Sequence, residues 1–216
     1  MSVLRVNEIF YSIQGESSYA GRACVFVRLT GCNLRCSYCD TTYAYDEGDD
    51  LEIDEIIDRV GSYKCRLVEV TGGEPLIQAE TPSLIHDLVK QGYKVLLETN
   101  GSQDISKVHE DCVRILDIKC PSSGEEQSND LENLSRLSDH DEIKFVIGDR
   151  GDYDYAVTIL HRAKHKALRI NRVFFSPVFG KMTPRTLAGW ILEDHIDVSL
   201  HLQLHKLIWS HEKRGV

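Results

Sequence analysis

The chain alternates short apolar segments with longer amphipathic ones along most of its length. The apolar segments have the length and β-branched content of buried strands, and they cover residues 23–30, 66–71, 94–99, 114–119, 142–147, 172–176 and, as a further candidate, 197–202. Between them, apolar residues recur at helical spacing over residues 53–60, 81–91, 153–166 and 184–193. Alternating strands and helices form right-handed βαβ units around a parallel sheet. We therefore expect an α/β fold of about six units, either a partial (β/α)6 TIM-like barrel or an open sheet, because a complete barrel needs about eight.

The length of 216 residues suits one domain, residues 1–216, and the sequence contains no interdomain linker or internal repeat. The most polar stretch, residues 122–133, is expected to be a poorly ordered surface loop. In either sheet arrangement, ligands bind at the carboxyl ends of the parallel strands. Functional residues are therefore expected in the loops that follow the strands.

Composition argues against several classes of partner. The net charge of -9 argues against a nucleic-acid backbone or an anionic membrane as the main partner, and no apolar run is long enough to span a bilayer. The first residues lack the apolar core of an export signal, and the seven cysteines lack the spacing of a disulfide framework. We therefore expect a cytoplasmic protein. Four cysteines are expected to be small buried apolar residues, namely Cys24, Cys65, Cys112 and Cys120.

The other three cysteines form the motif C-x3-C-x2-C at Cys32, Cys36 and Cys39, directly after the first expected strand. Three thiolates on one loop can hold a metal centre that keeps an open position for a small molecule. Two alternatives stay open on spacing alone. A distant histidine could complete a zinc site, although zinc sites commonly use a second C-x-x-C pair that this sequence lacks, or the three thiols could be unrelated.

A second motif, Thr71-Gly72-Gly73-Glu74-Pro75, follows the next expected strand, where paired glycines let the backbone approach a ligand closely. Together with Tyr38 before the last cysteine, the two motifs resemble those of the radical S-adenosylmethionine superfamily. The resemblance implies that the cysteines hold a 4Fe-4S cluster whose fourth iron is chelated by S-adenosyl-L-methionine. It also implies that an electron from the cluster cleaves this cofactor to a 5′-deoxyadenosyl radical.

Five further segments, spread over nearly the whole chain, narrow the resemblance. Residues 8–17, 21–29, 98–101, 117–124 and 202–206 are similar to segments of the 7-carboxy-7-deazaguanine synthase family. That family converts 6-carboxy-5,6,7,8-tetrahydropterin to 7-carboxy-7-deazaguanine and ammonia by radical ring contraction, in the pathway to queuosine and other deazapurines. The resemblance implies a pterin substrate, Mg2+ as a further cofactor, a reducing protein such as a flavodoxin, and a homodimer. The cysteine loop here has the short C-x3-C form and lacks the insertion found in some members.

The resemblance assigns roles residue by residue. Cys32, Cys36 and Cys39 would ligate the cluster and Thr41 would bind Mg2+. The residues implied to contact substrate are Ile13, Gln14, Gly15, Glu16, Arg28, Thr71, His205 and the C-terminal Val216, and those implied to contact S-adenosyl-L-methionine are Gly73, Ser122 and Ser176.

Other interpretations of single residues remain open. Thr41 could instead cap a loop, Arg28 could be a solvated residue on an alternating strand, and His205 could be structural. At the level of function, a glycyl-radical activase shares both motifs but acts on a protein. A non-enzymatic iron–sulfur or zinc module is a third hypothesis, although it would be better supported by a fourth local thiolate.

Overall fold

The computed structural model describes residues 2–165, 172–209 and 214–216. Its core is one sheet with the strand order β3-β1-β2-β4-β5-β6-β7-β8-β9. Pairing is parallel from β2 through β9, whereas β1 is antiparallel to both β2 and β3. The strands are β1 (Val3–Ile13), β2 (Ala23–Leu29), β3 (Asp49–Glu52), β4 (Leu67–Gly72), β5 (Lys94–Thr99), β6 (Val113–Ile118), β7 (Glu142–Ile147), β8 (Val173–Pro177) and β9 (Ser199–Leu200). The expectation of an α/β fold with a partial barrel is confirmed, because the parallel sheet is curved and not closed.

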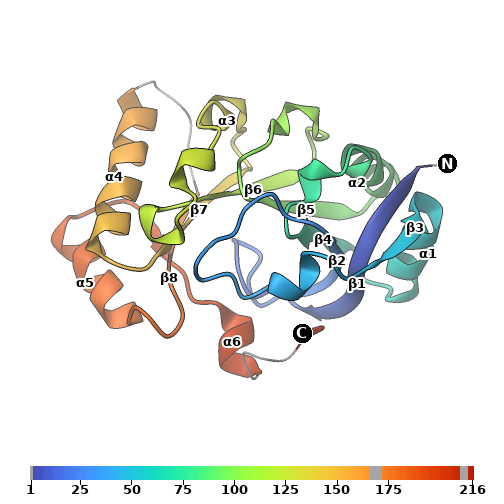
Figure 1. Cartoon of the computed structure of the whole chain (residues 1–216), viewed down its shortest axis with the longest axis horizontal. Coiled ribbons are helices and arrows are strands. Elements are labelled where there is room, and N and C mark those ends of the chain that lie inside the picture. The colour runs from blue at the N-terminus through green and yellow to red at the C-terminus, as the bar shows by residue number, and fades with distance from the viewer. Residues whose placement is uncertain (1, 166–171, 210–213) are drawn as a thin grey trace.

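Five helices lie around the outside of the curved row of strands (Figure 1): α1 (Ile53–Ser62), α2 (Thr81–Lys90), α3 (Asn133–Arg136), α4 (Arg150–His165) and α5 (Pro184–Glu193). Two apolar cores fill the space between helices and sheet. One contains Ile56 of α1 and Leu84 of α2, and the other contains Tyr153 of α4 and Leu187 of α5. A third, smaller cluster lies on the other face of the sheet, where Phe26 and Leu96 meet. The helices therefore cover one face, and the concave face is left for function.

The short helix α6 (Leu204–Ile208) lies apart from the other helices, close to the C-terminal end of the chain (Figure 1). It follows β9 at one edge of the sheet, and the backbone N–H of Leu204 donates to the carbonyl of Gly15, just after β1, at 3.0 Å. The loop after β1 is also tied to the far side, because the backbone N–H of Ser18 donates to Glu142 of β7 at 3.1 Å. These contacts link the two sides of the open barrel.

Two strands of the structure were missed by the sequence analysis. β1 mixes apolar residues with Arg5, Asn7 and Glu8, so neither face reads as a continuous apolar stripe. β3 has only four residues, and three of them are acidic. Both strands owe their structure to pairing with neighbours in the sheet, which the local pattern does not encode.

Other expectations need smaller corrections. The candidate strand at 197–202 shortens to Ser199–Leu200. The helix expected over 153–166 begins at Arg150, and its expected end, Lys166, lies outside the described residues. The stretch 122–133 lies largely at the surface, as expected, but it is not poorly ordered. It contains the 3-10 turn η5 (Glu126–Ser128), and the amide of the buried Asn133 donates to the carbonyls of Gly101 and Gln103 at 3.1 and 2.8 Å. No helix among the described residues is long and apolar enough to cross a membrane.

Candidate active site

A cavity of about 460 Å³ opens at the carboxyl ends of the parallel strands. It is lined by every residue to which the resemblance assigned a role, except Ser122 and Ser176. The predicted residues that line it are Ile13, Gln14, Gly15, Glu16, Arg28, Cys32, Cys36, Cys39, Thr41, Thr71, Gly73, His205 and Val216. Segments that are almost two hundred residues apart in the chain therefore meet at one place. For example, the amide of Gln203 donates to the carboxylate of Glu16.

The cysteine loop is held by hydrogen bonds on two sides. The N–H and the hydroxyl of Ser37 donate to the carbonyls of Ser123 and Ser122 at 3.0 and 2.7 Å. On the other side, the N–H of Glu74 donates to the carbonyl of Gly31 at 2.8 Å. The cysteine loop is thereby held against the loops that follow β4 and β6.

Gly73 lies where no other residue would fit. A Cβ atom at this position would be 2.2 Å from the carbonyl oxygen of Gly31 and 2.6 Å from the Cβ of Cys32. Only glycine permits this close approach of the two loops. The Gly-Gly motif therefore places its backbone directly beside the first cysteine.

Glu74 stabilises the loop that contains Gly73. Its carboxylate is completely buried and accepts from the N–H of Asn100 at 2.6 Å, the N–H of Leu76 at 2.9 Å and the hydroxyl of Thr99 at 2.8 Å. The loops after β4 and β5 are thus joined through one side chain. The amide of Asn100 in turn points to the sulfur of Cys32 at 3.9 Å.

The thiols of the loop are only partly exposed. Burial raises the pKa of Cys36 to about 11 and raises the pKa of Cys32. Because metals bind the thiolate, loading of this site releases protons. Among the described residues, no three His, Cys, Asp or Glu side chains converge where a single metal ion could bind. Iron–sulfur clusters are held by cysteine thiolates, so the three cysteines of this loop stay the predicted ligand set.

The other cysteines lie away from the cavity. Cys24, Cys112 and Cys120 are buried, as expected for small apolar residues, but Cys65 is partly exposed and differs from that expectation.

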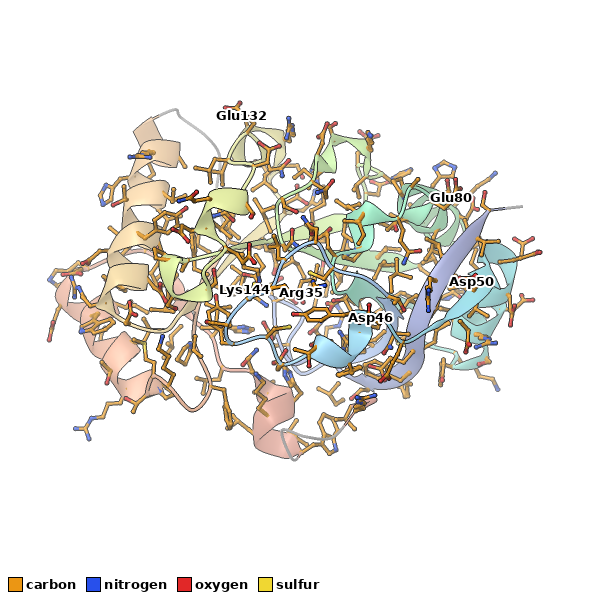
Figure 2. All side chains as sticks on the ribbon, viewed as in Figure 1. Arg35, Asp46, Asp50, Glu80, Glu132 and Lys144 are labelled. Atoms are coloured by element: carbon orange, nitrogen blue, oxygen red, sulfur yellow. The ribbon has the colours of Figure 1, made fainter. Side chains whose placement is uncertain are left out.

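A cluster of charged side chains occupies the floor of the cavity and centres on Lys144 of β7. Its ammonium group lies 2.7 Å from Glu16, 3.6 Å from Asp117 and in direct contact with Glu98. Lys144 lies near the middle of the molecule, whereas Asp50 and Glu132 lie at its periphery (Figure 2). Burial opposes the charge of Lys144, but these carboxylates raise its pKa well above the usual range.

The carboxylates around Lys144 do not share one charge state. Burial favours the neutral form of Glu16, but the charge of Lys144, the nearby His205 and the hydrogen bonds from Lys144 and Gln203 together outweigh burial and hold the pKa of Glu16 well below its usual range. Burial raises the pKa of Glu98 despite the same lysine, and burial with the charge of Glu98 raises that of Glu69. The cavity floor thus combines an ionised Glu16–Lys144 pair with carboxyl groups that resist ionisation.

Gln14 has both ends of its side chain occupied by the protein. Its amide nitrogen donates to the carboxyl group of Glu69, and its amide oxygen accepts from the N–H of Glu16 at 3.0 Å. Gln14 therefore orients the Gln14–Glu16 loop and the wall that this loop forms.

Arg28 of β2 also lines the cavity, and the hypothesis that it is solvated is wrong. Its side chain is 16% exposed, and its Nε donates to Oε1 of Glu8 at 2.8 Å. Burial disfavours the charge, but Tyr43 and Glu8 raise the pKa of Arg28 above its usual value. A charged guanidinium therefore lines the cavity.

Helix α6 closes a third side. His205 packs against Gly15 so closely that a Cβ atom on this glycine would be 2.3 Å from Nδ1 of the histidine. Burial lowers the pKa of His205, so its imidazole is neutral near pH 7. Lys206 pairs with Asp40 at 2.5 Å, and Asp40 accepts from the hydroxyl of Thr41 at 2.9 Å.

The two predicted residues outside the cavity have other surroundings. Ser122 donates its hydroxyl to Asp152 at 2.5 Å and its N–H to the same carboxylate at 2.7 Å. Ser176 is completely buried in β8, and its hydroxyl has no hydrogen-bond partner among residues 2–165, 172–209 and 214–216. Their contact with a cofactor stays a prediction.

The sequence analysis missed the charged floor, although a signal for it was present. All its members except Glu16 interrupt otherwise apolar strand segments, and they are Glu69, Glu98, Asp117 and Lys144. A charge inside a buried parallel strand needs a paired or functional environment. In a partial barrel that environment is the concave face.

Comparisons with known proteins agree with this geometry. The family model of the radical SAM superfamily matches residues 26–191. The 7-carboxy-7-deazaguanine synthase of Koribacter versatilis is 47% identical, with 99% of this chain and 100% of that protein aligned, and that of Chlorobaculum tepidum is 45% identical, with 99% and 97% aligned. The crystal structure of QueE from Escherichia coli has the same fold, with a TM-score of 0.78, 21% identity, and 93% of this chain and 95% of that chain covered. This chain therefore belongs to the radical SAM superfamily and, within it, to the 7-carboxy-7-deazaguanine synthase family.

Proposed function

We propose that this enzyme converts 6-carboxy-5,6,7,8-tetrahydropterin to 7-carboxy-7-deazaguanine and ammonia by radical-mediated ring contraction, as a step in queuosine and 7-deazapurine biosynthesis. Family membership supports the enzyme class, a radical SAM lyase. One observation carries the proposal: the cysteine loop, the Gly-Gly turn and Arg28 line one cavity. Its volume of about 460 Å³ lies in the range of small-molecule sites.

The cavity fits a 4Fe-4S cluster and S-adenosyl-L-methionine by its donor set. Cys32, Cys36 and Cys39 would ligate the cluster, and the backbone at Gly73 would contact the cofactor where a side chain has no space. When bound, the two groups supply the radical that starts the reaction. Asp117 also lines the cavity, and its Oδ1 is buried without a hydrogen-bond partner among the described residues, so it is available to accept from a bound donor.

Ser122 and Ser176 would contact the same cofactor only after a local rearrangement. The hydroxyl of Ser122 would have to leave Asp152, and Ser176 would have to gain access from its completely buried position. The unpaired hydroxyl of Ser176 supports a ligand contact, because buried hydroxyl groups are normally hydrogen-bonded.

The pterin would lie between the Ile13–Glu16 segment and Arg28. A pterin edge carries N–H donors, which the ionised Glu16 can accept, and Arg28 would bind the substrate carboxylate. Thr71, the neutral His205 and Val216 complete the lining. Lys144 keeps Glu16 ionised, so this residue accepts a hydrogen bond without taking a proton.

Thr41 would bind Mg2+ together with the substrate. Mg2+ prefers hard oxygen ligands and keeps several waters, and the hydroxyl of Thr41 lies beside the carboxylate of Asp40 at 2.9 Å. The pairing of Asp40 with Lys206 limits the local negative charge, which favours a shell completed by the substrate carboxylate and water.

The remaining proposals concern partners. We expect a cytoplasmic homodimer that receives electrons from a reducing protein such as a flavodoxin. The cysteine loop supports access for a reductant, because Asn33, Arg35 and Ser37 are exposed next to the cluster ligands.

An anaerobic assay tests the function directly. Reconstituted protein is mixed with dithionite, S-adenosyl-L-methionine, Mg2+ and 6-carboxytetrahydropterin, and 7-carboxy-7-deazaguanine is measured by mass spectrometry. We expect product from the wild type and none from Cys36→Ala. Cleavage of S-adenosyl-L-methionine with unchanged pterin would contradict the substrate and favour an activase.

A second variant tests the substrate contact. Arg28→Ala is expected to raise the KM for the pterin at least tenfold while the iron content stays unchanged, because a charge-assisted pair contributes about 1.5–3 kcal/mol. Arg59→Ala is the matched control, since this arginine lies on the exposed face of α1 and pairs only with Glu55 in that helix among the contacts described. An unchanged KM in Arg28→Ala would contradict the assignment.

A further inference from the structure

We infer that Glu8 and Tyr43 are positioning residues that orient Arg28 so that only the end of its guanidinium, Nη1 and Nη2, receives the substrate carboxylate. The inference rests on the proposed function, because it concerns how the proposed substrate is recognised. It extends that function by identifying what selects a carboxylated pterin over a neutral one.

The contacts around Arg28 form a short hydrogen-bonded chain. Nε of Arg28 donates to Oε1 of Glu8 at 2.8 Å, and the hydroxyl of Tyr43 donates to the same oxygen at 2.9 Å. The guanidinium carbon also lies 5.8 Å from the ring centre of Phe10 and 5.9 Å from that of Tyr43. Two aromatic rings and one carboxylate therefore surround the guanidinium.

This arrangement determines which edge of the guanidinium a ligand can use. An arginine can bind a carboxylate bidentately through Nε with one Nη, or through both Nη atoms. Glu8 occupies Nε, so the first mode is blocked. The side chain is 16% exposed and lines the cavity, which leaves the end with the two Nη atoms for a ligand.

A β-bulge explains why Glu8 reaches Arg28. In the register of β1 and β2, Val6 is opposite Leu29 and Glu8 is opposite Arg28, with the shift between Val6 and Glu8. An uninterrupted ladder continuing from Val6 would put Asn7 opposite Arg28. Bulges commonly redirect side chains next to active sites. Further along the same face of the sheet, the rings of Phe10 and Phe26 stack with their centres 4.9 Å apart, next to Glu8 and Arg28.

Tyr43 connects this pair to the cysteine loop. It lies in a 3-10 turn, η1 (Thr42–Ala44), four residues after Cys39 and two after Thr41. Its ring is covered by Arg214, whose guanidinium carbon lies 4.0 Å from the ring centre and whose Nη1 pairs with Glu47 at 3.0 Å. Arg214 therefore restrains the ring of Tyr43, and the tyrosine hydroxyl holds Glu8 in place.

The geometry of the contacts explains why Glu8 does not prevent Arg28 from binding a second carboxylate. A carboxylate that pairs fully with Arg28 would weaken the attraction for a second carboxylate. Glu8 shares its Oε1 with the hydroxyl of Tyr43 and contacts Arg28 through one nitrogen, so the guanidinium keeps its terminal donors. The pair thus fixes geometry and leaves donors for the substrate.

Two conservative variants test the inference in the reconstituted holoenzyme. Tyr43→Phe removes only the hydroxyl, and Glu8→Gln removes the charge at nearly constant size. We expect each to raise the KM for 6-carboxytetrahydropterin about three- to tenfold, the effect of one net hydrogen bond, with kcat within about twofold. Discrimination against the 6-carboxamide analogue should fall by the same factor. Tyr11→Phe, at an exposed position of β1, is the matched control and should change neither.

A double-mutant cycle separates positioning from a general structural effect. If Tyr43 acts through Arg28, adding Tyr43→Phe to Arg28→Lys should raise KM no further. Additive effects, or unchanged KM in both single variants, would overturn the inference. Iron content and circular dichroism of every variant verify that the fold and the cluster are intact.

A measurement on the protein without substrate keeps the inference testable if the proposed function fails. The Nε–H of Arg28 should exchange slowly in the 15N NMR spectrum of the wild type and at least tenfold faster in Glu8→Gln. Equal exchange rates would overturn the positioning role, whatever the substrate is. Slow exchange without pterin turnover would refute the proposed function and leave the orientation of Arg28 intact.

Discussion

Lys144 provides the sharpest test of the charged cavity floor. Its side chain is 6% exposed, and its ammonium group contacts Glu16, Glu98 and Asp117. Lys144→Met keeps much of the volume and removes the charge. Because breaking a buried pair leaves an uncompensated charge, we expect the free energy of unfolding to fall by about 3 kcal/mol, the lower end of the range for such pairs.

The lower end is expected because two of the three carboxylates have other ways to relax. Asp117 remains paired with the ammonium group of Lys119 at 2.9 Å. Burial already raises the pKa of Glu98, so Glu98 can remain protonated. Glu16 loses its main cation. For a chain of this size, about 3 kcal/mol corresponds to a fall in Tm of about 6–12 °C.

The loss should depend on pH with a defined sign. In the wild type the pKa of Glu16 is depressed, so this residue stabilises the protein above its unfolded pKa of about 4.3 and the contribution is lost at lower pH. Burial is the largest influence on Glu16, so we expect its pKa to rise above the unfolded value in Lys144→Met, which adds a cost as pH increases. The difference between wild type and variant should therefore shrink from pH 8 to pH 5.

Urea unfolding of anaerobically prepared protein, followed by circular dichroism, measures this difference. Lys94→Met is the control, because Lys94 is exposed on β5, and it should change stability by less than about 0.5 kcal/mol. Adding Glu16→Gln to Lys144→Met should recover part of the loss. A loss below about 1 kcal/mol, or one independent of pH, would refute the reasoning.

Substitutions at Cys36, Gly15 and His205 test other parts of the cavity. Cys36→Ala should lose most of the reconstituted iron in a colorimetric iron assay, whereas Cys24→Ala, at a buried strand position, should retain it. Gly15→Ala should raise the KM for the pterin because the new methyl group displaces His205, whereas Gly189→Ala, which has open space in a helix, should stabilise the protein by about 0.5–1 kcal/mol in urea unfolding. His205 stabilises the fold above its unfolded pKa of about 6.5, since burial lowers its folded pKa, so the urea midpoint of His205→Gln should fall less than that of the wild type between pH 7.5 and 5.5. A steeper fall in that variant would contradict the assignment.

The sequence alone determined the parallel core and the position of the cysteine loop. Periodicity of apolar residues is a local property, so the main strands and helices could be read within a few positions of their observed ends. The cysteine spacing and the Gly-Gly turn are local as well. Since the carboxyl ends of parallel strands share one edge of the sheet, these motifs had to meet there.

The tertiary structure alone decided the partners of the charged and antiparallel elements. β1 has a mixed pattern and becomes a strand by pairing with β2 and β3, and its bulge places Glu8 opposite Arg28. Lys144 finds Glu16 across 128 residues of sequence. α6 packs on Gly15 so closely that a side chain at this position would collide with His205. Such pairings depend on where distant segments meet in space, and a charge in a strand reveals that it needs a partner without revealing which one.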